Sequence, residues 1–406
     1  MIASGRLRRF TGGLNDRWAL LSLATLAYWV GTQALRPMVV LRLEQLGASD
    51  AAIGLIIGAY SFSSFLLAVP SGRVVDRVGL WHALQGSQVA MAVAGVGFAT
   101  AAHVAWLTAV LLAAGVAELG VWLALQALAS HAGTGERLRR RLAVFSFAWG
   151  AGLAVGPMVG STLFDRAGFA AVGWVYAVGA LVGLVASFWV PYRHGGHLGQ
   201  EPVPLRQAVR SMWTQPVLRG VLLSSFVTLY IYGVRNSFYP LFLQRAGVSV
   251  PRIGLLLSIL GLASLLIRLP LPLLLRRVGT ERLLVAAMWV SVAAMTVTPW
   301  LGTIWLWAPA AAVAGFGLGI NPPVTVELMA RHTGLAERGL AMGLRVTSNR
   351  LAQAIQPVVF GTVAAVVGLA SAFAVSGVFI AGITGWAARE TQRGRSRQVN
   401  AAPPDP

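Results

Sequence analysis

The sequence has no cysteine and few charged residues. Its 406 residues include no cysteine at all, which excludes disulfide bonds, thiolate metal sites and cysteine nucleophiles. Only 11% of the residues are charged, whereas 56% are hydrophobic. A water-soluble chain of this length needs a more polar surface, so we expect most of the surface to face lipid.

Several signatures of catalysis and of metal or nucleotide binding are also missing. The sequence contains no glycine-rich phosphate loop with a lysine, no serine elbow, and no cluster of histidines or carboxylates at metal-ligand spacing. We therefore expect no catalytic residue, no metal and no cofactor, and we do not expect an enzyme.

Acidic residues are scarce compared with basic ones. The chain has 13 Asp and Glu against 32 Lys and Arg, which gives a formal net charge of +19. Such an excess can indicate nucleic acid. The arginines, however, fall in short links between apolar segments, and basic links alternate with links that are nearly free of charge. This is the pattern of a membrane protein with basic cytoplasmic loops, so no nucleic-acid partner is expected.

Apolar segments of about 20 residues recur along the chain, and this length crosses a bilayer as a helix. Because the backbone must satisfy its own hydrogen bonds in lipid, we predict an all-α membrane protein. We expect about twelve transmembrane helices. The predicted spans are 18–41, 51–71, 81–101, 104–129, 141–164, 170–191, 217–242, 252–272, 281–300, 303–329, 340–366 and 369–388.

The distribution of arginines predicts the orientation. With an even number of spans, all arginine-rich links fall on one side, and the opposite links carry only Arg42, Arg166, Arg245 and Arg252. Basic loops stay in the cytoplasm. We therefore expect a multi-pass protein of the bacterial inner (cytoplasmic) membrane with both termini cytoplasmic.

The second half of the sequence repeats the first at a constant offset of about 200 positions. The offset aligns Gly47 with Gly247, Ile53-Gly54-Leu55 with Ile253-Gly254-Leu255, Arg77-Val78-Gly79 with Arg277-Val278-Gly279, Pro157 with Pro357, and Gly168 with Gly368. We predict two pseudo-symmetric six-helix bundles, residues 1–191 and 217–388. The polar segment 192–216 is the predicted cytoplasmic linker, and 389–406 the predicted cytoplasmic tail.

The link after the second span reads GRVVDRVG over residues 72–79. It resembles the G-x-x-x-D-R-x-G loop of the major facilitator superfamily, which lies between helices two and three of that family. The spans, the linker and the repeat extend the resemblance over the whole chain. The resemblance implies an alternating-access transporter in which Gly72, Asp76, Arg77 and Gly79 form a conformational gate. The alternative is an ordinary basic turn.

The fifth span reads GLAVGPMVG over residues 152–160. This resembles the family's G-x-x-x-G-P-x-x-G motif, which is found mainly in exporters of the drug/proton antiporter type. Gly152, Gly156 and Gly160 make a smooth face for a closely packed helix, and Pro157 bends the span. We assign these four residues to the conformational elements, although such a face is also a common packing device without a transport direction.

Charged residues inside the spans are functional candidates by default. Glu118, in the fourth span, is the only carboxylate expected near mid-membrane. Carboxylates buried there can exchange protons near neutral pH, which predicts a proton-coupling role; the alternative is a structural ion pair with Arg36 or with an arginine of the other half. Arg36 and Arg235 occupy nearly equivalent places in the two repeats. They either clamp an anionic group of a substrate or snorkel to the outer headgroups.

Further candidates lie on the predicted cavity helices and near their ends. Asn321-Pro322-Pro323 in span ten is expected to interrupt the helix and to mark a binding or hinge element. Glu327 is expected to pair with Arg345 or Arg350 as a cytoplasmic lock. The remaining candidates for the substrate cavity are Trp29, Trp122, Gln126, Tyr232 and Asn321.

These residues and the resemblance favour one function and leave two others open. The first is secondary active transport of a small organic solute by alternating access, as proton-coupled efflux. The second is proton-coupled import of an organic anion, and the third is a membrane sensor or scaffold that keeps the fold without flux. The expected partners are a small-molecule substrate, protons and the lipid bilayer, and the chain is predicted to act as a monomer.

Overall fold

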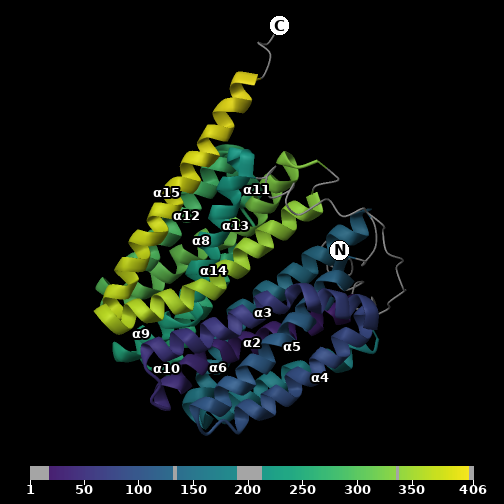
Figure 1. The fold of residues 1–406 in the computed structure, drawn as a ribbon, viewed down its shortest axis with the longest axis vertical. Helices are drawn as coiled ribbons and strands as arrows, with labels where there is room; N and C mark the ends of the chain where they lie inside the picture. The colour runs from purple at the N-terminus through teal and green to yellow at the C-terminus, as the bar shows by residue number, and fades with distance from the viewer. Residues whose placement is uncertain (1–17, 131–134, 190–212, 335–337, 402–406) are drawn as a thin grey trace, which may run out of the picture. The chain divides into compact units, whose positions relative to one another are not determined.

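The computed structural model describes residues 18–130, 135–189, 213–334 and 338–401 (Figure 1). Within these ranges all regular structure is helical and no strand occurs. The predicted all-α class is therefore confirmed.

In the described part of its first half, the chain forms five helices. They are α2 (Trp18–Gln45), α3 (Asp50–Val78), α4 (Leu80–Ala99), α5 (Val104–Ser130) and α6 (Gly135–Ser187). Helix α6 contains two predicted spans, and its backbone leaves the helical region at Gly168, with φ 77° and ψ −178°. Glycine adopts this conformation without steric penalty, so the two spans are separated by a single residue.

The described part of the second half is divided into more elements, some of them short. They are α8 (Pro216–Asn236), α9 (Phe238–Arg245), α10 (Val250–Leu266), α11 (Leu271–Val278), α12 (Thr280–Val297), the 3₁₀ turn η1 (Thr298–Trp300), α13 (Ile304–His332), α14 (Arg338–Val367) and α15 (Leu369–Ala401). The predicted span 217–242 is broken at Ser237, between α8 and α9. Helix α15 continues well past residue 388, where the last predicted span ends.

Seven of the described helices are long and apolar enough to cross a membrane, and eight if α10 and α11, which are bent by 66° at their junction, form one span. Since the 53 residues of α6 hold two of the predicted spans, the twelve predicted helices are consistent with this fold.

The backbone repeats at the predicted offset. Gly47 and Gly247 have φ of 83° and 80°, and the same agreement holds for Gly79 with Gly279 (90° and 88°) and for Gly168 with Gly368 (77° and 84°). The amide of Gly47 donates to the carbonyl of Glu44 at 2.9 Å, as the amide of Gly247 does to Gln244 at 3.0 Å. The predicted internal repeat is thus confirmed at the level of individual turns.

Two predictions about local backbone are wrong. Residues 72–78 were expected in a link, but α3 continues through Val78 and only Gly79 separates it from α4. Helix α13 was expected to break at Asn321-Pro322-Pro323, yet it runs without interruption from Ile304 to His332. The two prolines lack the amides that would bond the carbonyls of Leu318 and Gly319. The hydroxyl of Thr325 donates further along the helix, to the carbonyl oxygens of Asn321 (2.9 Å) and Pro322 (3.1 Å).

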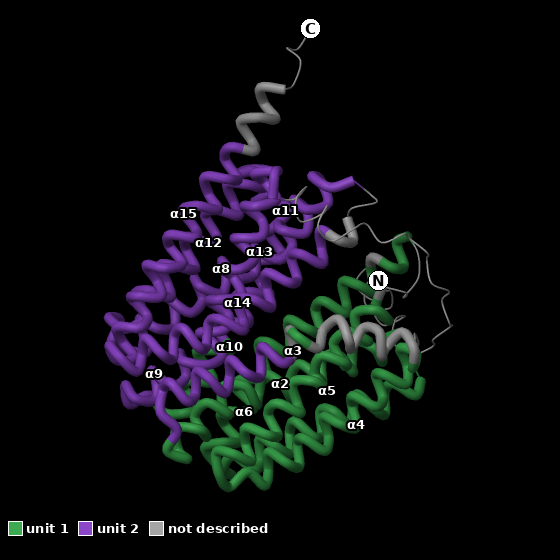
Figure 2. Tube along the Cα trace, viewed as in Figure 1, with its two compact units in different colours: residues 1–47, 66–196, 249–258 green, residues 48–65, 197–248, 259–406 purple. Residues whose placement is uncertain are grey.

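The chain forms two compact units, shown in different colours in Figure 2. Unit 1 comprises residues 1–47, 66–196 and 249–258, and unit 2 comprises 48–65, 197–248 and 259–406. The start of α3 therefore belongs to unit 2, and the start of α10 to unit 1.

Equivalent contacts in the two repeats hold the start of α3 in unit 2 and the start of α10 in unit 1. In unit 2, Gly54 of α3 lies against the carbonyl of Pro357 in α14; in unit 1, Gly254 of α10 lies against the carbonyl of Pro157 in α6. A Cβ on Gly254 would be 2.7 Å from that oxygen, so only glycine permits the approach.

Candidate functional site

A buried ion pair joins α2 and α5 in unit 1. Nη2 of Arg36 donates to Oε2 of Glu118 at 2.8 Å, and the side chains are 22% and 5% exposed, respectively. Arg36 is thus turned into its own unit and does not snorkel. The pair is one of the two roles expected for Glu118; the coupling role stays a prediction.

Two tyrosines complete the surroundings of Glu118. The hydroxyl of Tyr176, on α6, donates to Oε1 at 3.0 Å, and the hydroxyl of Tyr28, on α2, donates to the backbone carbonyl of Glu118 at 3.2 Å. Both carboxylate oxygens therefore accept a hydrogen bond, and three helices fix the group. Hydrogen bonds to a charged acceptor are stronger than neutral ones, so this arrangement holds Glu118 in place. Neither tyrosine was among the residues predicted from the sequence.

An aromatic cluster borders the ion pair. The rings of Trp29, Trp122 and Trp149 lie 5.2–5.7 Å from one another, and Phe145 stacks on Trp122 at 6.2 Å. The guanidinium of Arg36 lies 5.9 Å from the ring centroid of Trp29. The structure thus brings the predicted Trp29 and Trp122 together beside Glu118. The predicted Gln126 is an exposed residue of α5.

The glycine face of α6 receives α2. A Cβ on Gly152, Gly156 or Gly160 would collide with Trp29, Gln33 or Ala34, respectively; for Gly156 it would lie 2.6 Å from Cβ of Gln33. The three glycines therefore let the backbones of α2 and α6 pack closely against each other. This packing sets the position of Trp29 and Arg36, which both lie on α2. The role of this face, with Pro157, in conformational change stays a prediction.

The second repeat makes the equivalent contact between a glycine and a glutamine, but the two residue types have changed places between the helices. In unit 1 the glutamine is Gln33 of α2 and the glycine is Gly156 of α6. In unit 2 the glycine is Gly233 of α8 and the glutamine is Gln356 of α14, whose amide occupies the space of the missing side chain. Both glutamines are fully buried.

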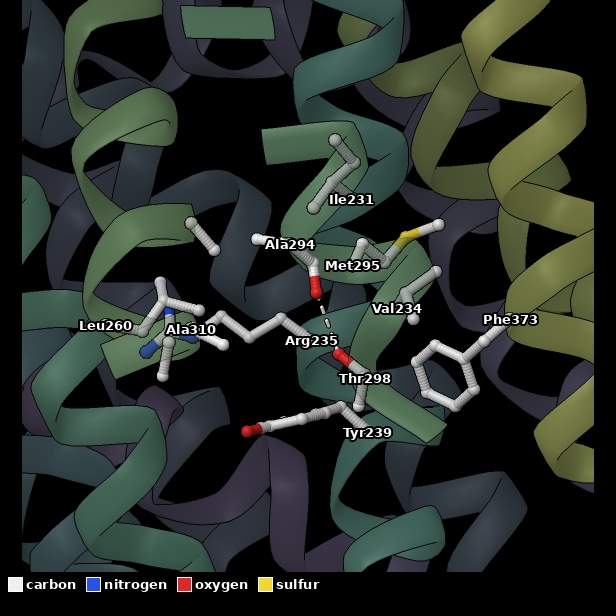
Figure 3. Close-up of a pocket in the computed structure, with 12 residues that line it drawn as sticks. Ile231, Val234, Arg235, Tyr239, Leu260, Ala294, Met295, Thr298, Ala310 and Phe373 are labelled. Atoms are coloured by element: carbon white, nitrogen blue, oxygen red, sulfur yellow. Dashed lines mark hydrogen bonds between the residues drawn. The ribbon is translucent and has the colours of Figure 1, made fainter. Parts of the chain in front are cut away.

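Arg235 lies at the end of α8 in unit 2 and is 3% exposed, so it does not snorkel either. Its guanidinium is 5.4 Å from the ring centroid of the predicted Tyr232. It borders a cavity of about 30 Å³ (Figure 3). The cavity is lined by Ile231, Val234, Arg235, Tyr239, Leu260, Ala294, Met295, Thr298, Ala310, Ala311, Ala314 and Phe373.

The predicted Asn321 is 2% exposed, and its Nδ2 donates to the carbonyl of Ser224 at 3.3 Å, which ties α13 to α8.

The expected lock at Glu327 is not formed as predicted. Glu327 pairs with Arg331, one turn later on α13, and not with Arg345 or Arg350. The geometry of α13 explains the difference, since residues four positions apart lie on one helix face and need no neighbouring helix.

Two further carboxylates of unit 2, Asp50 and Glu390, form ion pairs that were not predicted. Arg245 holds both carboxylate oxygens of Asp50, at 2.6 and 2.9 Å. Glu390, whose side chain is 4% exposed, accepts from Nε of Arg219 at 3.0 Å and from Arg393 at 3.3 Å. Asp50 is the first residue of α3, whereas Glu390 lies within α15, two residues beyond the last predicted span.

The structure does not describe the side chains of part of the predicted gate. Gly72, Asp76 and Arg77 fall within the last turns of α3, but their side chains are not among those the structure describes. Gly79 has a positive φ of 90° and precedes α4. Among the described residues, no group of three or more His, Asp or Glu side chains could hold a metal ion.

Relatives of this chain are membrane transporters. It is 25% identical over 195 residues to the inner membrane transport protein YajR of Escherichia coli, a match that covers 45% of this chain and 42% of YajR. It is 18% identical over 380 residues to the uncharacterized MFS-type transporter MJ1560 of Methanocaldococcus jannaschii, covering 91% and 96%. The uncharacterized MFS-type transporter YhjO of Bacillus subtilis is 29% identical over 222 residues, covering 51% of each. The chain thus matches about half or less of YajR and YhjO.

Solved structures share the fold. A bacterial homolog of the human lysosomal transporter Spinster, in an inward-facing and unoccupied conformation, superposes with a TM-score of 0.71 at 15% identity, covering 93% of this chain and 96% of that one. The human organic anion transporter MFSD10 gives 0.65 at 18% identity, covering 91% and 98%. The family model of the Major Facilitator Superfamily matches residues 21–288 and 221–404. Fold, repeat and family match agree: this chain is a multi-pass membrane transporter that belongs to the Major Facilitator Superfamily.

Proposed function

We propose that this transporter is a proton-coupled carrier that exports a small organic solute by alternating access, with Glu118 as the residue that carries the proton. The observation behind the proposal is the 2.8 Å ion pair between Arg36 and Glu118, buried beside an aromatic cluster in unit 1. An ionisable pair in a lipid-embedded bundle is costly to maintain, which makes a functional role the default interpretation.

The pair supplies a physical route to coupling. A proton that enters on Glu118 neutralises the carboxylate and leaves Arg36 without its counter-charge. Removing one partner of a buried pair costs roughly 3–5 kcal/mol, so the protonated state favours any event that restores a counter-charge or exposes Arg36 to water. Binding of solute and proton are then linked, and the linkage acts in both directions.

Two functions are distinguished by whether proton binding weakens or strengthens the binding of solute. Efflux by antiport requires solute and proton to exclude each other; the glycine motif over residues 152–160 supports this reading, because it resembles the motif of exporters. Import of an organic anion is the second candidate. A solute carboxylate would replace Glu118 as the partner of Arg36 once Glu118 is protonated, so solute and proton would bind together. The partial exposure of Arg36, 22%, supports this alternative.

We place the protein in the bacterial inner membrane as a monomer with both termini cytoplasmic. The basic links and the name of the related inner membrane transport protein YajR support this placement. The remaining cavity residues proposed to contact solute are Trp29, Trp122, Gln126, Arg235, Tyr232 and Asn321. Gly72, Asp76, Arg77 and Gly79 are the proposed gate.

The test begins with a search for the solute. Cells that express the protein would be screened for labelled or toxic compounds whose accumulation changes. A compound found in this way would then be followed in proteoliposomes under imposed pH gradients of either sign. Accumulation in acidic vesicles, with protons leaving, supports antiport and efflux; accumulation in alkaline vesicles supports symport and import. If the wild-type protein moves none of the compounds, the carrier proposal is wrong and a sensor or scaffold is favoured.

A further inference from the structure

Two tryptophans of unit 2 are exposed close to the end of the last predicted span. Trp386, on α15, and Trp213, just before α8, are 46% and 50% exposed. Their ring centroids lie 6.4 Å apart, with the ring planes at 82° to each other. Tryptophans exposed on membrane proteins are enriched at the level of the lipid headgroups. The pair therefore indicates that this end of unit 2 lies at the surface of the bilayer.

Basic residues lie beside the two rings. Nη1 of Arg219, in the first turn of α8, donates to the backbone carbonyl of Trp213 at 2.7 Å. Arg389 and Arg393, both exposed, follow Trp386 on α15 by about one and two turns. The name α8–α15 patch is used below for Trp213, Arg219, Trp386, Arg389, Glu390 and Arg393. Three guanidiniums and one carboxylate leave this patch with a net positive charge.

Close packing between α8 and α15 fixes the patch. A Cβ on Gly220 would lie 2.4 Å from Oγ1 of Thr391, so the absence of a side chain at Gly220 lets the two helices pack this closely. The packing brings Arg219 beside Glu390, whose buried carboxylate accepts from Nε of Arg219 at 3.0 Å. Glu390 also accepts from Nη1 of Arg393 at 3.3 Å. The guanidiniums are thus partly ordered in advance, which lowers the entropic cost of binding a ligand.

An apolar stripe on α15 leads to the patch. Val375, Phe379 and Trp386 are 47%, 47% and 46% exposed, and they follow one another by about one and two helical turns. They therefore lie on the same face of α15. Residues 369–393 form one of the helices that are long and apolar enough to cross a membrane. A hydrocarbon chain can lie along this stripe while a charged group at its end reaches the arginines. A soluble acidic partner would not use the stripe.

The first repeat lacks this arrangement. The offset of about 200 positions aligns Arg219 with Ala19 and Trp386 with Ala186. The fold therefore does not require the patch for its packing. A general preference for arginine on the cytoplasmic side would act on both halves, and it selects no tryptophan pair and no buried carboxylate. A binding role specific to unit 2 explains the patch better.

We propose that the α8–α15 patch binds the headgroup of an anionic phospholipid, whose acyl chains lie along the stripe of Val375, Phe379 and Trp386. The phosphate accepts hydrogen bonds from the guanidiniums of Arg389 and Arg393, which are strong because both partners are charged. The bound lipid contacts both α8 and α15 and stabilises unit 2. The site is independent of the proton-coupling role of Glu118 in unit 1, so either assignment can fail without the other.

Thermal unfolding of the full-length protein in an uncharged detergent tests the site. The melting temperature would be measured with increasing phosphatidylglycerol, and separately with phosphatidylcholine that has the same acyl chains but no net charge. A ligand that binds only the folded state raises this temperature in a saturable way. We expect a rise of about 2–4 °C with phosphatidylglycerol and a smaller rise with phosphatidylcholine. Equal rises with the two lipids would overturn the proposal.

Matched variants separate this site from general attraction between opposite charges. The double variant Arg389→Gln/Arg393→Gln should lose the additional rise with phosphatidylglycerol. Arg276→Gln/Arg277→Gln, which removes the same charge from exposed residues of α11, should keep it. Equal responses of the two double variants would contradict the site. If the first does not fold, Trp386→Leu keeps an apolar residue in the stripe and should at least double the lipid concentration needed for half the effect. An unchanged concentration would also contradict the site.

Two further measurements identify the ligand. Sodium phosphate at constant ionic strength presents the charge without the acyl chains, and it should not raise the melting temperature. A rise equal to that with phosphatidylglycerol would mean that the patch binds a free anion and that the lipid assignment is wrong. Native mass spectrometry counts the bound lipids directly. The wild type should retain more phosphatidylglycerol than Arg389→Gln/Arg393→Gln under the same conditions, and equal retention would contradict the site.

Discussion

The hydroxyl of Tyr176 donates a hydrogen bond of 3.0 Å to Oε1 of Glu118, while Arg36 holds the other carboxylate oxygen at 2.8 Å. Each of the three residues comes from a different helix: α6, α5 and α2, respectively. The position of the carboxylate therefore depends on how these helices pack, and a change in that packing would alter its environment.

Replacing Tyr176 by phenylalanine removes one donor and leaves the ring. A hydrogen bond to a charged group contributes roughly 1.5–3 kcal/mol, so we expect Tyr176→Phe to lower gradient-driven flux about tenfold. Flux in proteoliposomes measures this. Tyr230→Phe is the matched control, because it removes a buried hydroxyl that bonds Ser376 at 3.2 Å in unit 2. Equal losses in both variants would mean that Tyr176 has only a structural role.

Adding a methyl group to the glycine face of α6 should destabilise unit 1. In Gly156→Ala the new Cβ would lie 2.6 Å from Cβ of Gln33, and overpacking of this kind costs roughly 1–3 kcal/mol. We expect a lower melting temperature in detergent. Gly86→Ala, in α4, has no neighbouring atom within 4 Å and should leave the melting temperature unchanged or raise it slightly. A Gly156→Ala protein as stable as the wild type would show that α2 and α6 are not held at this distance.

The ion pairs of Glu390 and of Asp50 in unit 2 should differ in strength. Glu390 is 4% exposed and pairs with Arg219, which is 23% exposed, so Glu390→Gln leaves a partly buried positive charge without this carboxylate and should cost about 3 kcal/mol. Asp50 and Arg245 are 13% and 40% exposed, and Asp50→Asn should cost at most about 1 kcal/mol. Melting temperatures of both variants would check the order, which is wrong if Asp50→Asn is the more damaging change.

The absence of cysteine makes the orientation directly testable. Single cysteines at Ala246, between α9 and α10, and at Gly334, after α13, lie at exposed positions on links that are expected on opposite sides. In intact cells a membrane-impermeant maleimide should label Ala246→Cys. It should label Gly334→Cys only after permeabilisation. The reverse pattern would invert the predicted topology.

The sequence contained enough information for the spans and the repeat. Lipid exposure requires long apolar helices, and a turn that needs a positive φ requires glycine, so Gly47, Gly168 and their counterparts mark equivalent turns in both halves. Helix continuity was harder to predict. Pro322 and Pro323 remain inside α13, and the packing that keeps a helix continuous through two prolines is invisible in a local sequence pattern.

The candidate site was predictable only in part. The depth of Glu118 in its span identified it as a candidate, and Arg36 was one of the partners considered. Tyr176 was missed because tyrosines are frequent in membrane helices and only the packing of α6 on α5 reveals its bond to Glu118. Glu327 was paired with the wrong arginine because the nearest partner, Arg331, lies on its own helix. Side-chain partners between helices depend on rotation and depth, which periodicity does not determine.

The central claim is that Glu118 carries the coupled proton, and Glu118→Gln tests it most directly. Glutamine keeps the shape and hydrogen-bonding capacity of the side chain but cannot ionise, so solute exchange between two equal pools should persist while accumulation driven by a pH gradient is lost. Glu327→Gln, which removes a carboxylate from a pair within one helix, should behave as the wild type. The measurement is labelled-solute uptake into proteoliposomes with and without an imposed pH gradient. Accumulation by Glu118→Gln at the wild-type level under the gradient would contradict the account.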